Sequence, residues 1–235
     1  MGEVSVLKIR IKFSKQGAMK FIGHLDLMRY FQKALRRAEI PVAFTEGFSP
    51  HMIMSFAAPL GVGLTSNGEY MDIEVHGSMS SKEAVLRLNR VMVEGIQMIS
   101  YRQIPEEKAS KAMSLVTAAD YIVTFQEGYV PEGFWEKEVP AFFASDTIVI
   151  LKKSKKGQSE VDIKPLIYKM EAGDGKIFMR LATGSSNNLK PELVMEAFAR
   201  YCGLTLSPFA IQVNRLEVYA EKGISLEALG EEIGE

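Results

Sequence analysis

The octapeptide VLKIRIKF, residues 6–13, decides how the first part of the chain folds. Its apolar residues alternate with Lys8, Arg10 and Lys12, which is the period of a β-strand with one buried face. The sequence therefore predicts a strand that packs one face on a core and shows a basic face to water. Those three cations are candidate contacts for a polyanion such as nucleic acid.

The next segment, HLDLMRYFQKALRRAEI (residues 24–40), has helical spacing. At about 100° per residue its apolar side chains fall on one side of the helix, and Pro41 ends it. Cations with few acidic residues among them cluster on the opposite side. They are suited to contact phosphates, although a solvated helix face is the alternative. These cations are Arg29, Lys33, Arg36 and Arg37.

The rest of the first half continues with strands on either side of residues 47–51 and an alternating strand at 69–75. A helix follows from Ser81 to Gly95, with Glu83 in its first turn and a strand after it. The order is strand, helix, strand pair, helix, strand, which is the ferredoxin-like split βαβ arrangement.

The same order of elements recurs in the second half, through segments predicted as strands at 120–125, 146–153, 176–183 and 210–221 and as helices at 131–145 and 190–203. We therefore expect an α+β fold of two tandem ferredoxin-like (βαββαβ) units with antiparallel sheets. The expected divisions are a first unit at 1–105, a linker at 106–118, a second unit with an inserted hairpin at 119–222, and an acidic tail at 223–235 that forms a surface helix or a frayed end.

Composition favours a soluble globular protein, because 47% of the 235 residues are hydrophobic and 24% are charged. No apolar run approaches the roughly 18 residues of a membrane helix, no signal-peptide layout is present, and Cys202 is the single cysteine, so we expect a cytoplasmic protein with no membrane partner. Residues 1–105 carry 13 Lys and Arg against 9 Asp and Glu, whereas the remainder carries 15 against 20. This polarity permits an anionic partner on the first half.

The turn GFSPH, residues 47–51, has two interpretations. Gly47 can take a positive φ, Pro50 fixes φ, and Ser49 is pushed toward an extended conformation, so a strand corner explains these residue types. The alternative is that the rigid corner holds His51 in a cleft as an acid, a base or a phosphate donor. His24, at the start of the first helix, is either half-buried or helps to hold a phosphate.

Other motifs are less specific. His24, His51 and His76 lack metal-ligand spacing, and there is no CxxC or HExxH motif, so we expect no metal site built by this chain alone. The basic segment KKSKKG (residues 152–157) is a solvated turn or a nucleic-acid finger, and the loop at 184–188 lacks the known nucleotide-binding patterns. The roles of both segments stay open.

The stretch GHLDLMRYFQKALRRAEIPVAFTEGFSPHMIMSFAAPLGVGLTSNGEYMDIEV resembles the radical-SAM-linked family of uncharacterised bacterial proteins, which are found fused to, or beside, a B12-binding radical SAM protein. The similarity spans about residues 6–75, and the second half is matched more loosely through DIKPLI and LKPELVMEAF. Gly23, Ser49 and Met52 depart from the serine, asparagine and proline of the pattern. The matching residues are His24, Leu25, Asp26, Arg29, Arg37, Ala38, Pro41, Gly47, Phe48, Pro50, His51, Pro59, Leu60, Gly63, Ser66 and Glu69.

The resemblance implies a partner, a radical SAM protein on a separate chain, with the iron–sulfur cluster, SAM and cobalamin on that partner and no cofactor on this chain. It also makes RNA a reasonable partner. We therefore expect a non-catalytic accessory module that binds RNA or presents a substrate in RNA modification or processing. Its cleft would be lined by Asp26, Gly47, Phe48, Ser49, Pro50 and Glu69 together with His24 and His51.

Two alternatives remain. The tandem layout is similar to that of the CRISPR repeat-RNA-processing endonucleases, which cleave without metal, and a metal-independent endoribonuclease would use His24 and His51 as acid and base. The other alternative is a protein-interaction scaffold that binds no nucleic acid.

Overall fold

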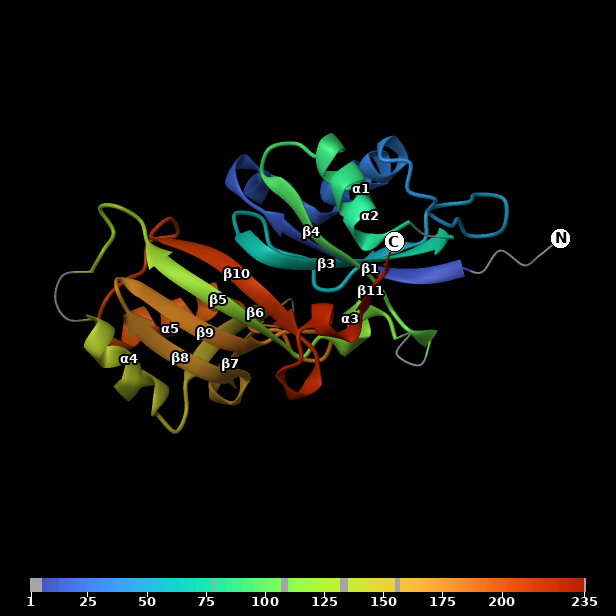
Figure 1. The fold of residues 1–235 in the computed structure, drawn as a ribbon. Helices are drawn as coiled ribbons and strands as arrows, with labels where there is room; N and C mark the ends of the chain where they lie inside the picture. Colours follow the sequence, from blue (N-terminus) through green and yellow to red (C-terminus); the bar gives the residue numbers. More distant parts are fainter. Residues whose placement is uncertain (1–5, 78, 107–109, 132–134, 155–156, 235) are drawn as a thin grey trace. The chain divides into compact units, whose positions relative to one another are not determined.

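The computed structural model describes residues 6–77, 79–106, 110–131, 135–154 and 157–234. The chain divides into two compact units, unit 1 with Met1–Thr117 and Glu217–Glu235, and unit 2 with Ala118–Leu216. The described residues form five α-helices and mostly antiparallel strands, so the fold is α+β (Figure 1). No helix in the described ranges has both the length and the apolar character that crossing a bilayer requires.

Unit 1 is a sheet with two helices on one face (Figure 1). The order in its sheet is β11-β4-β1-β3, and β2 pairs with β3. Since β1 and β2 both pair with residues 71–73 of β3, they lie on opposite sides of it. The elements are β1 (Val6–Lys15), η1 (Gly17–Phe21), α1 (His24–Arg37), β2 (Met54–Phe56), β3 (Thr65–His76), α2 (Ser81–Val91), β4 (Ile96–Gln103), α3 (Ala112–Leu115), η4 (Glu221–Gly223), η5 (Leu226–Leu229) and β11 (Glu231–Glu232).

The core of unit 1 lies between the sheet and the two helices. Ile9, Ile11 and Phe13 on β1 are fully buried and belong to one hydrophobic cluster with Phe31 and Leu35 of α1. The rings of Phe13 and Phe31 meet edge to face with centroids 4.8 Å apart. Burial of each large apolar side chain stabilises the fold by roughly 1.5–3 kcal/mol, so the alternation of β1 and the helical period of α1 together explain this half-sandwich.

The opposite face of the sheet is polar but only partly open. Lys8 is exposed, as expected of the basic face, whereas Arg10 is only 1% exposed and Lys12 is half-buried. The prediction that β1 shows its whole basic face to water is therefore wrong at Arg10. The reason is that later segments cover this face, because Arg10 donates hydrogen bonds to the carbonyl oxygens of Ser110 and Leu226.

The C-terminal segment also differs from the expected surface helix or frayed end. It returns to unit 1, where Leu226 is fully buried and β11 pairs antiparallel with β4. Ser81 and Ile233 exchange two hydrogen bonds, from the Ser81 amide to the Ile233 carbonyl and from the Ile233 amide to the Ser81 hydroxyl, each 2.9 Å long. The buried side chain of Leu226 and these hydrogen bonds help to hold the segment in place.

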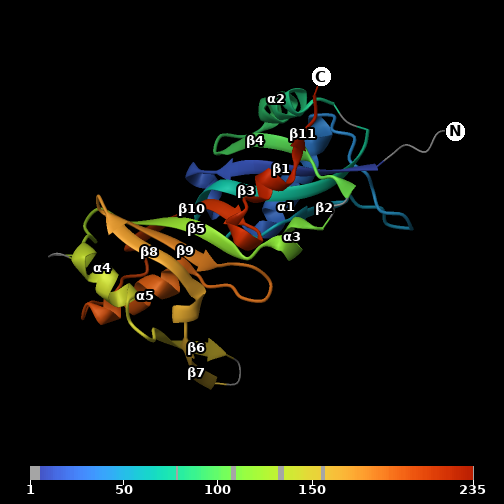
Figure 2. The same ribbon diagram turned by 60° about the horizontal axis from the view of Figure 1, so that its bottom comes forward.

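Unit 2 has a sheet in the order β10-β5-β9-β8 and a separate hairpin, β6-β7, which stands apart from that sheet in the turned view (Figure 2). Helices α4 and α5 pack through Phe142 and Phe198, whose ring centroids are 5.2 Å apart. The elements are β5 (Ala118–Phe125), α4 (Trp135–Phe143), β6 (Val149–Ser154), β7 (Gly157–Asp162), η3 (Lys164–Leu166), β8 (Ile167–Gly173), β9 (Lys176–Ala182), α5 (Pro191–Tyr201) and β10 (Ile211–Tyr219), whose end from Glu217 belongs to unit 1.

The second strand of the unit 2 sheet is not the predicted one. Residues 146–153 were expected there, but β6 pairs only within the hairpin and β8 takes the place beside β9. The pairing of β8 with β9 shifts register between Ile167 and Lys169, so the buried residues Ile167 and Met170 are not spaced by two. The period-2 signal that marks a strand is therefore lost in β8.

Candidate functional site

The outward face of α1 carries the four predicted cations, Arg29, Lys33, Arg36 and Arg37, and all four are exposed. Within the described residues, the side chains of Lys33 and Arg36 make no hydrogen bond or ion pair. Arg37 donates to the Val91 carbonyl at 3.1 Å, and Arg29 contacts Asp26 at 3.3 Å. Exposed pairs of this kind are worth at most about 1 kcal/mol, so they leave the cations available to an anionic ligand.

His24 begins α1 and faces the core side. It is half-buried, and its ring lies edge to face on Phe56 with centroids 5.2 Å apart. The N-cap residue, Gly23, provides no side-chain hydrogen bond to the first turn. Packing against Phe56 accounts for the position of His24.

The corner at residues 47–51 is the tip of a hairpin. The Thr45 amide donates to the His51 carbonyl and the Ile53 amide to the Ala43 carbonyl, each at 2.9 Å. Gly47 has φ of +107°, the left-handed region in which glycine is favoured. The expectation of a strand corner is confirmed. The predicted cleft-lining residues Gly47, Phe48, Ser49 and Pro50 are exposed, and the Phe48 side chain projects fully into solvent.

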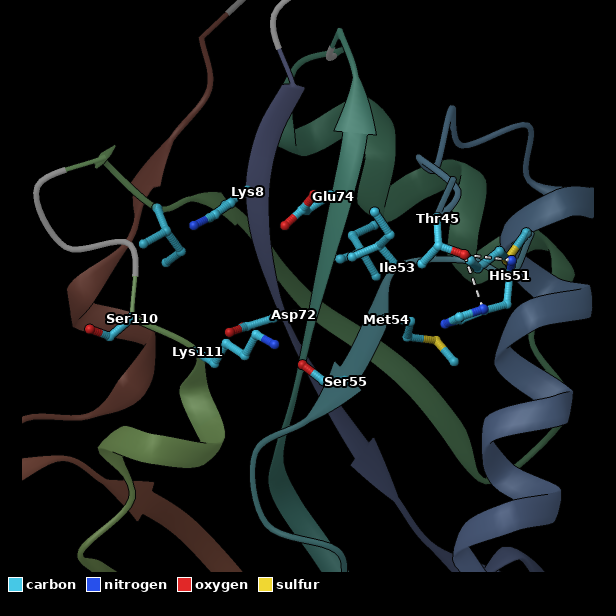
Figure 3. Close-up of a pocket in the computed structure, with 13 residues that line it drawn as sticks. Lys8, Thr45, His51, Ile53, Met54, Ser55, Asp72, Glu74, Ser110 and Lys111 are labelled. Carbon is cyan, nitrogen blue, oxygen red and sulfur yellow. Dashed lines mark hydrogen bonds between the residues drawn. The ribbon is translucent and has the colours of Figure 1, made fainter. Parts of the chain in front are cut away.

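A cavity of about 270 Å³ opens beside the base of this hairpin, within unit 1 (Figure 3). Of the candidate residues named from the sequence, only Lys8 and His51 line it. The structure places Asp26 exposed on α1 and Glu69 buried, both away from the cavity lining. The lining consists of apolar Met52, Ile53, Met54, Ile73 and Ile104 and of polar Lys8, Thr45, His51, Ser55, Asp72, Glu74, Ser110 and Lys111.

The two carboxylates of the cavity differ in their partners. Asp72 accepts two hydrogen bonds from Arg10, at 2.8 and 3.0 Å, and a third from the Ala112 amide at 2.7 Å. The carboxylate of Asp72 is therefore already engaged in hydrogen bonds within the protein. Glu74 is half-buried, and its carboxylate has no hydrogen-bond or ion-pair partner among the described residues.

Thr45 fixes His51 at the other end of the cavity. The Thr45 hydroxyl accepts the His51 amide proton at 3.1 Å and lies 3.0 Å from Nδ1 of the His51 ring. In the tautomer in which the Thr45 hydroxyl donates to Nδ1, the ring proton is on Nε2. Figure 3 shows the second ring nitrogen turned away from Thr45, toward Met54.

The cationic helix face and the cavity lie on different sides of unit 1. Asp72 and Glu74 alternate along β3 with Met71, Ile73 and Val75, which belong to the core beneath α1 and α2. The cavity is therefore on the face that α1 does not cover. His24 and His51 do not share a cavity, and no cluster of three or more potential metal ligands occurs within the described residues.

Sequence reasoning missed Ser55, Glu74, Ser110 and Lys111. One signal could have found Glu74, because the alternation of residues 69–75 places Asp72 and Glu74 on the face opposite the core. The basic tip of the β6-β7 hairpin falls in part on residues 155–156, which lie outside the described ranges. The loop at 184–188 is mostly exposed and is not part of this cavity.

Two solved structures are similar to the chain at low levels. A chain of a Cbf5-Nop10-Gar1 complex matches with a TM-score of 0.45 and 10% identity over 91% of this chain and 50% of that one, so the present chain spans about half its length. An unknown protein from Galdieria sulphuraria matches with a TM-score of 0.27 and 14% identity over 98% and 100% of the two chains. Neither similarity carries an argument about function.

No curated protein matched the chain. Residues 8–191 match the family described as "Uncharacterized protein conserved in bacteria (DUF2344)". The match covers β1 to the start of α5 and so includes the cavity of unit 1 and the cationic face of α1. The chain therefore belongs to the DUF2344 family of bacterial proteins.

Proposed function

We propose that this protein is an RNA-binding accessory module that acts beside a radical SAM enzyme in RNA modification or processing. The observation that carries the proposal is the exposed cationic face of α1, formed by Arg29, Lys33, Arg36 and Arg37. These residues span about 100° of the helix surface and roughly 12 Å along its axis. Four cations on such a surface can contact successive phosphates of a single strand.

The electrostatic nature of this contact sets a measurable salt dependence. Binding that neutralises about four phosphates of a single strand loses roughly 50-fold in affinity between 50 and 200 mM salt. Because the contacts are with phosphates, the loss is similar for RNAs of different sequence.

Fluorescence anisotropy of a labelled single-stranded RNA at both salt concentrations tests the proposal. The variant Arg36→Glu/Arg37→Glu should bind at least tenfold more weakly and show a smaller salt slope. The control Lys169→Glu/Lys176→Glu makes the same change in charge at exposed positions of unit 2 and should bind like the parent chain. Absent binding, or binding that ignores both salt and the α1 variant, overturns the proposal.

The partner rests on the resemblance to the radical-SAM-linked family, which supports a separate chain that holds the iron–sulfur cluster, SAM and cobalamin. Co-purification of this chain with a tagged radical SAM protein of the same bacterium, with and without ribonuclease, tests the association. A complex that survives ribonuclease supports a direct protein contact, and failure to co-purify in both conditions counts against the partner.

The strand orders support a finer description of the fold. We infer that each unit is ferredoxin-like, since β4-β1-β3-β2 and β10-β5-β9-β8 each arrange a βαββαβ sequence in the order 4-1-3-2. The two histidines of the endoribonuclease alternative lie in different surroundings, because His24 packs on Phe56 while His51 lines the cavity, and so RNA binding is the function that we favour.

A further inference from the structure

The cavity beside the hairpin base has firmly held walls. Asp72, held by its bidentate contact with Arg10, lines one wall, and the Ala112 amide, which donates to Asp72, ties the segment with Ser110 and Lys111 to the same carboxylate. Thr45 holds His51 at the opposite end. A site whose side chains are already fixed loses little conformational entropy when a ligand binds.

Glu74 and His51 are two polar residues of this cavity that can hydrogen-bond to a ligand. The Glu74 carboxylate has no partner among the described residues and is an acceptor, and Nε2 of His51 is a donor when Thr45 holds the ring as described above. Glu74 is half-buried, so a ligand donor that reaches its carboxylate can form a charge-assisted hydrogen bond there. The ligand that satisfies both groups has N–H donors and a carbonyl acceptor.

The cavity is small, and both polar and apolar residues line it. Ile53, Met54 and Ile104 line it, and its volume of about 270 Å³ lies just below the ~300–1,000 Å³ of pockets that take drug-sized ligands. A single planar heterocycle suits such a space, with the Ile53 side chain against one of its faces. Lys111 is exposed at the rim and provides a cation for an anionic group outside the ring.

We propose that the cavity of unit 1 binds one guanine nucleotide, with the base edge at Glu74 and His51 and the phosphate near Lys111. Guanine presents two adjacent N–H donors, which one carboxylate can accept together, and a carbonyl oxygen beside them for the histidine donor. Adenine and cytosine offer an amino group without the adjacent ring N–H. The inference deepens the proposed RNA function and rests on it for the source of the nucleotide, a guanine of a single strand.

Isothermal titration of the full chain with guanosine 5′-monophosphate, with adenosine 5′-monophosphate as the comparison, tests the inference. Bidentate base contacts discriminate by about 1–3 kcal/mol, so the guanine nucleotide should bind roughly 5- to 150-fold more tightly. The isosteric variant Glu74→Gln should abolish this preference. Lys111→Glu should weaken binding of the monophosphate at least fivefold and leave guanosine unaffected.

Methyl NMR of the same samples reports where the nucleotide binds, since the Ile53 methyl signals should shift on titration of the parent chain. It also shows whether the Glu74→Gln protein is folded, and Lys111→Glu, at an exposed position, gives a second variant that does not threaten the core. Equal affinity for the two nucleotides, no binding at millimolar concentration, or unchanged Ile53 methyl signals overturns the inference.

Failure here is distinguishable from failure of the proposed function. Arg36→Glu/Arg37→Glu lies on the other face of unit 1 and should leave affinity for the guanine nucleotide unchanged while it weakens RNA binding. If the chain binds guanine nucleotide but not RNA, the cavity is a site for free nucleotides and the proposed RNA function is rejected. If it binds RNA but not guanine nucleotide, only the inference about the cavity is rejected.

Discussion

Units 1 and 2 each carry a bidentate Arg–Asp pair at the same place in the sheet, but with the charges exchanged. In unit 1, Arg10 on β1 faces Asp72 on β3, and in unit 2, Asp120 on β5 faces Arg180 on β9. The paired atoms are 2.8 and 3.0 Å apart in the first pair and 2.7 Å apart in both contacts of the second. Equivalent strands therefore keep the same interaction with its polarity reversed.

The two pairs differ in which charge is buried. Arg10 is 1% exposed and Asp72 18%, whereas Arg180 is 36% exposed and Asp120 7%. The unit 1 pair buries a guanidinium, which cannot lose its charge, whereas the guanidinium of the unit 2 pair is partly exposed, so water can take its place beside Asp120. We therefore expect that removal of the more exposed partner lowers the free energy of unfolding more in unit 1 than in unit 2.

The largest expected effect comes from Asp72→Ala. It leaves the guanidinium of Arg10 buried without its counterion, and the loss of one partner from a buried pair costs about 3–5 kcal/mol. Urea unfolding followed by circular dichroism measures the change in the free energy of unfolding. The double variant Arg10→Met/Asp72→Ala is the control, because it removes both charges and should recover a large part of the loss. A single-variant cost below 1 kcal/mol would contradict the buried charge.

The next largest effect on stability concerns the C-terminal segment that covers the same pair. Leu226 is fully buried, and its carbonyl accepts a hydrogen bond from Arg10 at 3.3 Å. Leu226→Ala should destabilise the protein by roughly 3 kcal/mol through the cavity it leaves. Hydrogen exchange should then be faster in β11 and β4 than in β5 and β9. The exposed neighbour Glu231→Ala serves as the control, and equal destabilisation by both variants would show that the tail is not packed as described.

The sequence predicts part of this comparison and not the rest. The alternation of residues 6–13 and the helical period after His24 depend on neighbours along the chain, so β1 and α1 are found where they were expected. The burial of Arg10 depends on partners 62 and 216 residues away, and no local pattern shows which segments return to cover a strand. The same applies to the cavity, because Ser55, Glu74 and Lys111 come from three separate segments.

The exchanged pair of unit 2 should be less sensitive. Arg180→Ala removes a partner that is 36% exposed, so water can reach the carboxylate of Asp120 in its place, and the expected loss is about 2 kcal/mol at pH 7. The same urea titration measures it. Comparison with Asp72→Ala shows which of the two pairs is more sensitive to loss of its more exposed partner. A loss of stability in unit 2 equal to or above that in unit 1 would reject the explanation.

The smallest expected effect concerns a second ionic group on the covered face of unit 1. Lys12 contacts Glu217 at 2.7 Å and Glu227 at 2.9 Å. Burial lowers the pKa of Lys12, but its hydrogen bonds and charge interactions with both glutamates raise it overall. Burial raises the pKa of Glu227, but hydrogen bonds from Lys12 and Ser100, with the charges of Lys12 and Arg102, lower it overall below 4.5.

These shifts act at opposite ends of the pH range. A lowered carboxyl pKa stabilises the fold above pH 4.5, and that contribution disappears as the pH falls through the lowered value. The raised pKa of Lys12 stabilises the fold below pH 10.5 and loses its effect as the pH rises through the raised value. Glu227→Gln should therefore cost at most about 1 kcal/mol at pH 7, since the pair is partly exposed, and almost nothing near pH 3.

Thermal unfolding of the parent and Glu227→Gln chains from pH 3 to 8 measures this convergence. Glu231→Gln removes an exposed carboxylate nearby in the chain and should give a constant small difference. Curves that stay parallel for Glu227→Gln would show that Lys12 is held by Glu217 alone. Convergence at acidic pH would show that the returning tail contributes charge as well as Leu226 to the covered face, so that unit 1 depends on residues far along the chain for both its apolar and its ionic contacts.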